Sequence, residues 1–190
     1  FGRALAGPSD VRVVGNLRRG GLDPDVVRKV AEVEGVAAAV PMVQGVGIAA
    51  RPGASSGEEP VVILGVDCRV EAIVGSFACN EGFMADDPDL DIPLLVGPGV
   101  DTQAELRTPA GPVPLDTSIP AEGTLLRAFA DGEVVLFGLE TAQRVFDRDG
   151  RYDVAYVVAE PGVDTAGLRA RVAAAVGDRG GVLGPDEGPP

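Results

Sequence analysis

The chain has no histidine and no tryptophan among its 190 residues, and aromatic residues make up only 4% of it. Without an imidazole, the sequence cannot form a Ser-His-Asp or Cys-His catalytic arrangement, and it lacks the commonest metal ligand of proteins. A core without these large rings must be built from Val, Leu, Ile and Ala. Because valine is β-branched and abundant, this composition favours strands.

Positive charge is also scarce. The chain has 16 Lys and Arg against 29 Asp and Glu, with Lys29 as its single lysine, and its net charge is −13. Such a sequence cannot supply the basic face of a nucleic-acid-binding protein, and the same argument weakens binding to an anionic lipid surface. We therefore expect no nucleic acid among its partners.

Long apolar runs are missing as well. The nearest candidate for a membrane span, residues 35–50, is interrupted by glycines and by Pro41, and it is more typical of a buried strand. The sequence begins at Phe1 without a methionine. We therefore interpret it as an excised fragment from which targeting or membrane segments have been removed.

The first part of the chain has the pattern of a strand–helix–strand unit. Alternating or continuous apolar runs predict strands over residues 9–16, 36–50 and 60–67. Between the first two, residues 20–35 have the signals of a helix, with Asp23 as its N-cap, Pro24 in its first turn and Gly35 at its end. Residues 51–59 are rich in turn formers and are predicted to close a hairpin.

The last part of the chain repeats this plan. A strand is predicted over residues 151–160 and a helix over residues 164–181, with Asp164 as cap and Gly177 as stop, before a short final strand. Two such units on one chain predict an α+β fold with a ferredoxin-type split βαβ layer.

The middle of the chain, residues 68–150, differs in composition and is rich in Pro and Gly. Short strands are predicted over residues 92–97, 104–119 and 133–138, and a short helix over residues 139–150. We interpret this region as an inserted, mainly β subdomain. Residues 1–67 and 151–190 then form the α/β subdomain that carries it.

No metal or nucleotide site is predicted. Asp87, Asp89 and Asp91 match the first ligand positions of an EF-hand, but Ile92 stands where that loop needs glycine and Pro98 where it needs glutamate. The Gly-rich stretch before the first helix lacks the phosphate-binding patterns of nucleotide sites. With no GxSxG motif and no pair of acids singled out among 29, the sequence predicts no catalytic residue and no cofactor. A hydrolase that uses two converging carboxylates stays as an alternative.

Cys68 and Cys79 are the only cysteines. Ten residues separate them, which is not the spacing of a CxxC redox motif, and a zinc site would need further ligands. The spacing leaves two alternatives open: a pair of buried thiols, or a structural disulfide that closes a short loop.

Four stretches, taken in order, resemble one family. "DVVRKVAEVEGVAAAVPMVQG", "VVILGVD", "TPAGPVPL" and "LETAQRVFDRDGRYDVAYVVAEPGVDTAGLRARV" look like the extracytoplasmic core domain of FtsX-like/MacB-like ABC transporter permeases. The resemblance covers almost the whole chain and depends on order and spacing. It implies a porter-like α/β subdomain with an inserted, mainly β (Sabre-like) subdomain, located between the first and second membrane helices of a permease.

The resemblance also implies a function. The domain would be non-catalytic, and it would lie on the extracytoplasmic side of the plasma membrane. It would couple ATP hydrolysis by a cytoplasmic ATPase subunit to the handling of a substrate or partner protein, with a homodimer expected in the complete transporter. The inserted subdomain would contact the partner. The alternative is an extracellular ligand-sensing domain that binds a small molecule or peptide between its subdomains, near residues 67 and 151.

For the cysteines, the resemblance implies an oxidising location. It therefore predicts a structural disulfide between Cys68 and Cys79, which would restrain the chain where it passes into the insert.

Overall fold

The structure is a computed structural model, and it divides into two compact units. The first unit comprises Phe1–Met42, Cys68–Ala78 and Gly150–Pro190, and the second comprises Val43–Asp67 and Cys79–Asp149. The residues that the structure describes are 11–16, 20–53, 58–74, 95–116, 119–120, 133–148, 150–184 and 187. No helix within these residues is both long enough and apolar enough to cross a membrane.

The first unit contains a four-stranded antiparallel sheet with the strand order β10-β1-β9-β2. Its strands are β1 (Val11–Gly15), the first half of β2 (Val36–Ala50), β9 (Val154–Ala159) and β10 (Gly180–Leu183). The helix α1 connects β1 to β2, and the helix α5 connects β9 to β10. This is the split βαβ order of the ferredoxin-like layer, so the predicted fold class is confirmed.

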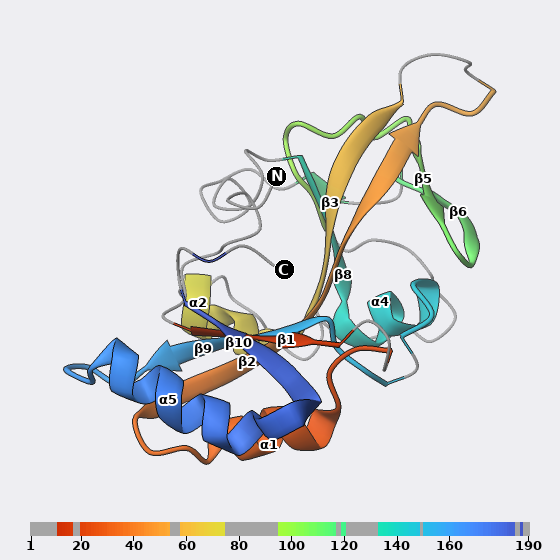
Figure 1. The fold of residues 1–190 in the computed structure, drawn as a ribbon. Helices are drawn as coiled ribbons and strands as arrows, with labels where there is room; N and C mark the ends of the chain where they lie inside the picture. Colours follow the sequence, from red (N-terminus) through yellow and green to blue (C-terminus); the bar gives the residue numbers. More distant parts are fainter. Residues whose placement is uncertain are drawn as a thin grey trace. The chain divides into compact units, whose positions relative to one another are not determined.

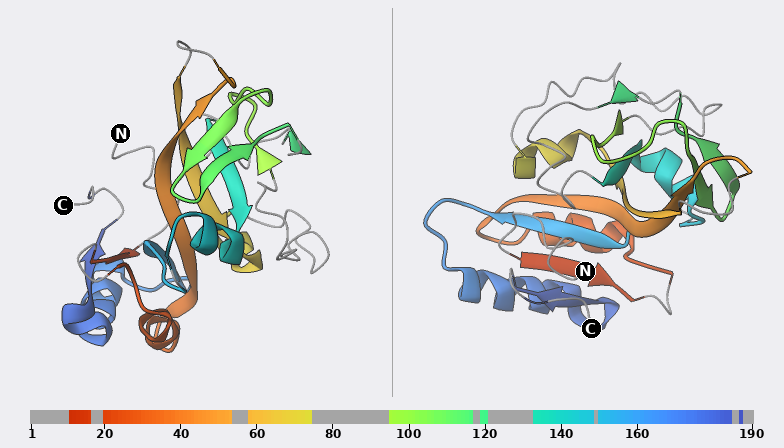
Figure 2. Two further views of the ribbon diagram at one scale, coloured as in Figure 1. Left: turned by 90° about the vertical axis from the view of Figure 1, so that its right-hand side faces the viewer. Right: turned by 90° about the horizontal axis from the view of Figure 1, so that it is seen from above.

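The helices α1 (Pro24–Ala31) and α5 (Thr165–Val176) lie side by side over one face of this sheet, as Figures 1 and 2 show. Each helix buries one stripe of apolar side chains against the strands. The buried helical residues are Val26, Val27, Val30, Leu168, Val172 and Val176. They pack with strand residues such as Val11, Val13 and Val157, so the core is built from valine and leucine, as the composition indicates.

Both predicted N-caps are confirmed. The Asp23 carboxylate accepts a hydrogen bond from the backbone N–H of Asp25 at 2.9 Å, and Asp164 does the same for Gly167 at 2.6 Å. Gly177 ends α5 with a φ of 61°, which suits glycine at this position.

The helix α1 ends at Ala31, four residues before the predicted stop at Gly35. The backbone N–H of Val33 bonds to the carbonyl of Val30, and that of Val36 bonds to the carbonyl of Val33. These tight turns bring Val36 into β2, which explains the early end of the helix.

The second unit is mainly β, as predicted for most of the insert. Its strands are the second half of β2, β3 (Glu59–Val66), β4 (Leu95–Val96), β5 (Glu105–Thr108), β6 (Gly111–Pro114), β7 (Ile119–Pro120) and β8 (Val134–Gly138). β2 and β3 form the predicted hairpin, β3 pairs with β8 in parallel, and β5 pairs with both β2 and β6.

The helix α4 (Leu139–Val145) packs on β3 at a glycine. A Cβ atom added to Gly65 would lie 2.2 Å from the Cβ atom of Ala142, so only glycine allows this close approach. Just beyond the helix, the ring of Phe146 meets that of Phe137 edge-on, with 5.8 Å between ring centroids.

The unit boundaries differ from the expected ones. The sequence pattern places residues 1–67 in the α/β subdomain and residues 68–150 in the insert, whereas the contacts place residues 43–67 in the second unit and residues 68–78 in the first. The reason is that β2 is a single strand of 15 residues that pairs with β9 in its first half and with β3 in its second. Apolar alternation reveals such a strand without revealing where its pairing partner changes.

Candidate functional site

The described part of the chain contains one of the two cysteines. Cys68 is half-buried and begins a 3₁₀ turn, Cys68–Val70, which continues into the helix α2 (Glu71–Val74). These helical residues were not predicted. Cys79 and the acidic run with Asp87, Asp89 and Asp91 lie outside the described residues, so the disulfide stays a prediction.

A cavity of about 640 Å³ lies beside Cys68 in the first unit. Its walls come from α1, the start of β2, the helical segment after β3, and the residues before β9. The lining residues are Pro24, Val27, Arg28, Ala31, Ala38, Ala39, Cys68, Arg69, Ala72 and Tyr152. Four alanines make the walls shallow and apolar, and two arginines add positive charge. Its volume is in the range of small-molecule sites.

A second cavity in the first unit, about 410 Å³, has polar walls that include two carboxylates, Asp23 and Asp25. Asp23 caps α1 and lies 3.7 Å from a guanidinium nitrogen of Arg151. Asp25 pairs with Arg28 one helical turn later, at 2.7 Å. Both carboxylates therefore have structural partners, and their geometry is that of a capped helix start. The sequence predicted the cap but not the cavity.

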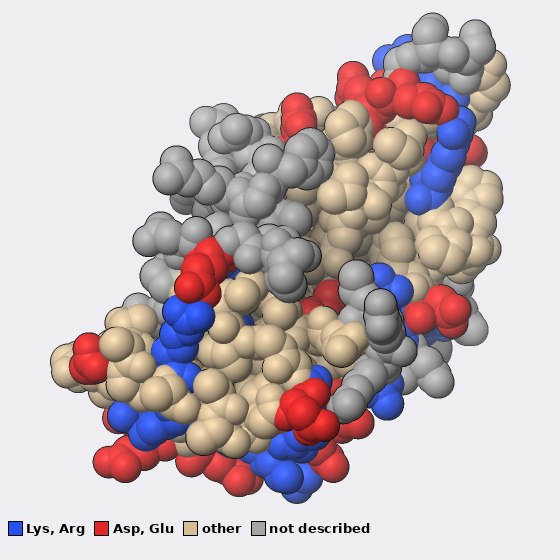
Figure 3. Space-filling view, in the orientation of Figure 1, with Lys and Arg blue, Asp and Glu red and all other residues tan. Residues whose placement is uncertain are grey.

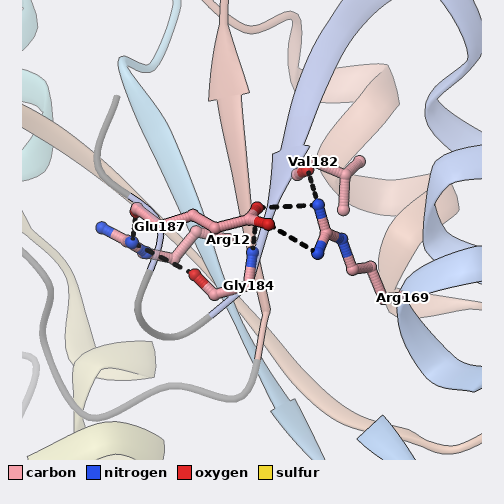
Figure 4. A network of polar contacts seen from close by, with 5 residues as sticks. All are labelled: Arg12, Arg169, Val182, Gly184 and Glu187. Atoms are coloured by element: carbon pink, nitrogen blue, oxygen red, sulfur yellow. Dashed lines mark hydrogen bonds and ion pairs between the residues drawn. The ribbon is translucent and has the colours of Figure 1, made fainter. Parts of the chain in front are cut away.

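A network of polar contacts closes the outer edge of β10 (Figure 4). Arg169, on α5, binds the Glu187 carboxylate with both of its terminal nitrogens, at 2.9 and 2.7 Å, and also donates to the backbone carbonyl of Val182 at 3.3 Å. The backbone N–H of Gly184 donates to the same carboxylate at 2.9 Å. We call the side chains of Arg12, Arg169 and Glu187 the polar clasp.

Arg12 completes the polar clasp from inside the unit. Its side chain extends from β1 and is only 3% exposed, and its guanidinium donates to the backbone carbonyls of Gly184, at 3.2 Å, and Glu187. A buried charge needs such partners. The hydrogen bond from Gly184 and the Arg169 guanidinium together hold the pKa of Glu187 below its ordinary value.

Sequence reasoning missed this network. Arg12 sits within a strand whose valines face the core, and the alternation indicates only that Arg12 faces the other side of the sheet. Its partners lie more than 170 positions away along the chain. No local pattern links residues so far apart.

In the second unit, a smaller pocket of about 270 Å³ lies along β2. Residues 43–46 line it, together with Ile63 of β3, Arg107 and Pro109 at the end of β5, and two residues beyond α4, Phe146 and Arg148. The side chain of Val46 is 49% exposed, and it is the only large apolar side chain in the described ranges that is exposed. No local pattern predicts this pocket, because its walls come from separate segments of the chain.

Charged side chains of opposite sign are interspersed over the described surface. Figure 3 shows acidic and basic residues next to one another near the tip of the β2–β3 hairpin and around α1. At the hairpin, Arg51 pairs with Asp101 and Arg107 with Glu58, each at 2.7 Å. The hydrogen bond from Arg51 is the main reason that the pKa of Asp101 lies below its ordinary value. Within the described residues, no group of three or more His, Cys, Asp or Glu side chains could hold a metal ion.

Comparison with known proteins supports the fold. The structure is similar to the periplasmic region of MacB from Actinobacillus actinomycetemcomitans, with a TM-score of 0.55 and 10% identity over 97% of this chain and 92% of that one. It is also similar to the extracellular domain of the noncanonic ABC-type transporter YknZ from Gram-positive bacteria, with a TM-score of 0.54 and 10% identity over 87% and 90% of the two chains. No protein-family model and no curated protein sequence matches the chain.

These similarities establish that the chain has the α+β fold seen in extracytoplasmic domains of ABC transporters. The fold implied by the resemblance to MacB-like domains is therefore confirmed. At 10% identity the likeness concerns the fold, and function must be argued separately.

Proposed function

We propose that this chain is a non-catalytic extracytoplasmic domain of an ABC transporter permease. The observation that carries the proposal is the similarity of fold over nearly the full length of both chains, with two neighbours that are themselves extracytoplasmic parts of transporters. In this role the chain would lie between membrane helices of the permease. A cytoplasmic ATPase subunit would be its partner through those helices.

In this proposal, ATP hydrolysis in the cytoplasm changes the separation of the membrane helices, and the domain transmits that motion to a substrate or partner protein outside. Hinge and shear movements of this kind need rigid bodies. The first unit has the construction of a rigid body, with a continuous apolar core beneath two helices. The polar clasp fastens residue 187 to that body, so a pull applied beyond it would be passed to β1 and α5.

The predicted disulfide belongs to the same proposal. Outside the cytoplasm, a Cys68–Cys79 bridge would persist, and the chain-entropy model gives it about 3 kcal/mol of stabilisation. Mass spectrometry of the unreduced protein, digested and alkylated, should find the two cysteines linked. Two alkylated thiols would contradict the bridge.

The complete gene tests the proposed function. We expect predicted membrane helices on both sides of this segment and a neighbouring ATPase gene. A variant of the transporter from which this domain is deleted should still hydrolyse ATP in membrane vesicles, but it should no longer transport its substrate. Soluble sequence on both sides of the segment would contradict the proposal.

The cavity beside Cys68 favours a second candidate function, the sensing of a small molecule outside the cell. Its volume suits a ligand of that size, and its apolar walls with Arg28 and Arg69 suit an apolar molecule that carries negative charge. Replacing Ala31 with leucine would fill the cavity from an exposed helical position, and Ala174→Leu on α5 is the matched control. A ligand that stabilises the control against heat but not Ala31→Leu would support this function, and equal effects would contradict it.

A further inference from the structure

The cavity beside Cys68 extends along one side of α1. It is lined there by residues that recur every three or four positions: Pro24, Val27, Arg28 and Ala31. This spacing places them on one face of the helix, and a rise of 1.5 Å per residue makes the stripe about 10 Å long. The cavity therefore follows two turns of the helix, which suits an elongated ligand.

The cavity is hollow because its walls carry small side chains. Alanine lines it from α1 at Ala31, from β2 at Ala38 and Ala39, and from α2 at Ala72. Val27 and Ala39 are buried and form its floor, whereas Ala31 and Ala72 are exposed and lie at its rim. A hydrocarbon chain that enters this space would cover apolar surface on several sides, which is favourable.

The charged side chains at the cavity are positive. Arg28 and Arg69 line it, and its described lining residues include no Asp or Glu, in a chain with a net charge of −13. One nitrogen of the Arg28 guanidinium binds Asp25 at 2.7 Å, but the two side chains are 65% and 67% exposed, so this pair is weak. A guanidinium has five N–H donors, so Arg28 can bind a second carboxylate beside Asp25.

We propose that this cavity binds a single-chain aliphatic carboxylate. The hydrocarbon chain would lie along the alanines over Val27 and Ala39, and the carboxylate would bind Arg28 at the rim. There the carboxylate keeps its contact with water, so binding does not bury an unpaired charge. The inference deepens the second candidate function, the sensing of a small molecule, and rests on it only for the location of the ligand outside the cell.

A series of chain lengths tests the hydrocarbon part. Hexanoate, octanoate and decanoate are titrated into the 190-residue chain at low salt, with the heat of binding as the readout. Each buried methylene should strengthen binding by about fourfold, so two more carbons should tighten it by roughly tenfold. An affinity that does not change with chain length would overturn the proposal.

Filling the cavity should act on the long chains most. Ala31→Leu puts a larger side chain at the rim, so it should weaken binding of decanoate by about tenfold or more and binding of hexanoate less. Ala174→Leu, at an exposed position of α5, should leave both affinities unchanged. Equal affinities of the two variants for decanoate would overturn the placement of the chain in this cavity.

Two neighbouring residues of α1 provide a matched pair for the charge. Arg28 and Lys29 are both exposed, but only Arg28 lines the cavity. Arg28→Gln should weaken binding of decanoate by roughly three- to tenfold at low salt and less at high salt. Lys29→Gln should leave it unchanged. Equal losses in the two variants would contradict a specific contact of the carboxylate with Arg28.

The ligand provides controls that need no variant. Decyltrimethylammonium has the same hydrocarbon chain with a positive head group, and it should fail to bind. Equal affinity of this cation would overturn the anionic specificity. Vesicles of phosphatidylglycerol distinguish a free carboxylate from a membrane lipid. The chain should not sediment with them, and sedimentation that decanoate prevents would assign the cavity to a lipid and overturn the free ligand.

The outcome can be separated from that of the proposed function. None of these titrations uses the transporter, so a failure here leaves the permease domain to be tested by the complete gene. If no carboxylate binds while another molecule stabilises Ala174→Leu but not Ala31→Leu against heat, the sensing function stands and the carboxylate is wrong.

Discussion

Two strand edges in this chain differ in what happens to their backbone polar groups. At the outer edge of β10, Arg169 binds the carbonyl of Val182, and Glu187 and Arg12 bind the N–H and the carbonyl of Gly184. At the edge of β2 away from β3, residues 43–47 carry no strand in the described part of the chain. Side chains close the first edge, whereas no strand of the described residues pairs with the second.

The difference shows that a protein can block one strand edge with side chains while another edge has no such block. An exposed edge is a template for pairing with other chains, and natural proteins usually block it with charges or cover it. The polar clasp blocks β10 in this way. The edge of β2 without a described strand is limited to five residues between two pairing registers, so it is too short for extensive aggregation.

The largest expected effect comes from loosening the helix that carries Arg169. Leu168 lies on the buried face of α5 and is fully buried, so Leu168→Ala should cost about 2–5 kcal/mol of unfolding free energy. The backbone amides at the outer edge of β10 should then exchange their hydrogens faster, while the exchange rates of residues 43–47 of β2 should not change. Urea unfolding and amide exchange would measure both, and a loss under about 1 kcal/mol would contradict the packing that we describe.

A smaller effect is expected from the second unit. Gly65→Ala forces a methyl group against Ala142, so α4 must shift, at a cost of about 1–3 kcal/mol. Gly45→Ala is the control, since its methyl group would enter open space. Urea unfolding of both variants measures the difference. If both variants were equally stable, the close contact of α4 with β3 would be wrong.

The polar clasp should depend on pH. The pKa of Glu187 is lowered in the folded chain, so its contribution to stability is complete above its ordinary value of 4.5 and is lost as the pH falls through the lowered pKa. Glu187→Gln should therefore be less stable than the wild type at neutral pH and equally stable in strong acid. Urea unfolding at both pH values measures this, and a difference that persists in acid would contradict the ionic role of Glu187.

The smallest effect should come from a charge placed on β2 at Val46. Val46 is half-exposed, so Val46→Asp should change the unfolding free energy by no more than about 0.5 kcal/mol. Urea unfolding of the variant and of the wild type measures the difference. A large loss of stability would mean that Val46 is part of the core.

The fold of the first unit could be predicted because its signals are local. Asp23 and Asp164 cap helices through residues two or three positions away, and the apolar stripes of both helices repeat within a few turns. The alternation along residues 36–50 likewise predicts β2 with its observed bounds. For this reason the ferredoxin-like layer followed from the sequence.

The candidate sites could not be predicted in the same way. The cavity beside Cys68 has walls from α1, β2 and the helical segment after β3, and contacts between segments so far apart leave no mark in local composition. The partners in the polar clasp are separated by 18 to 175 positions. The helical turns at Cys68 were missed because a segment of seven residues carries too little periodicity.

Amide hydrogen exchange at two residues tests the contrast between the edges most directly. The N–H of Gly184 should be protected by Glu187, so Glu187→Ala should speed its exchange. The exchange of the N–H of Val46, on the edge of β2, should stay unchanged. No change at Gly184, or an equal acceleration at Gly184 and Val46, would contradict the closure of the β10 edge by side chains.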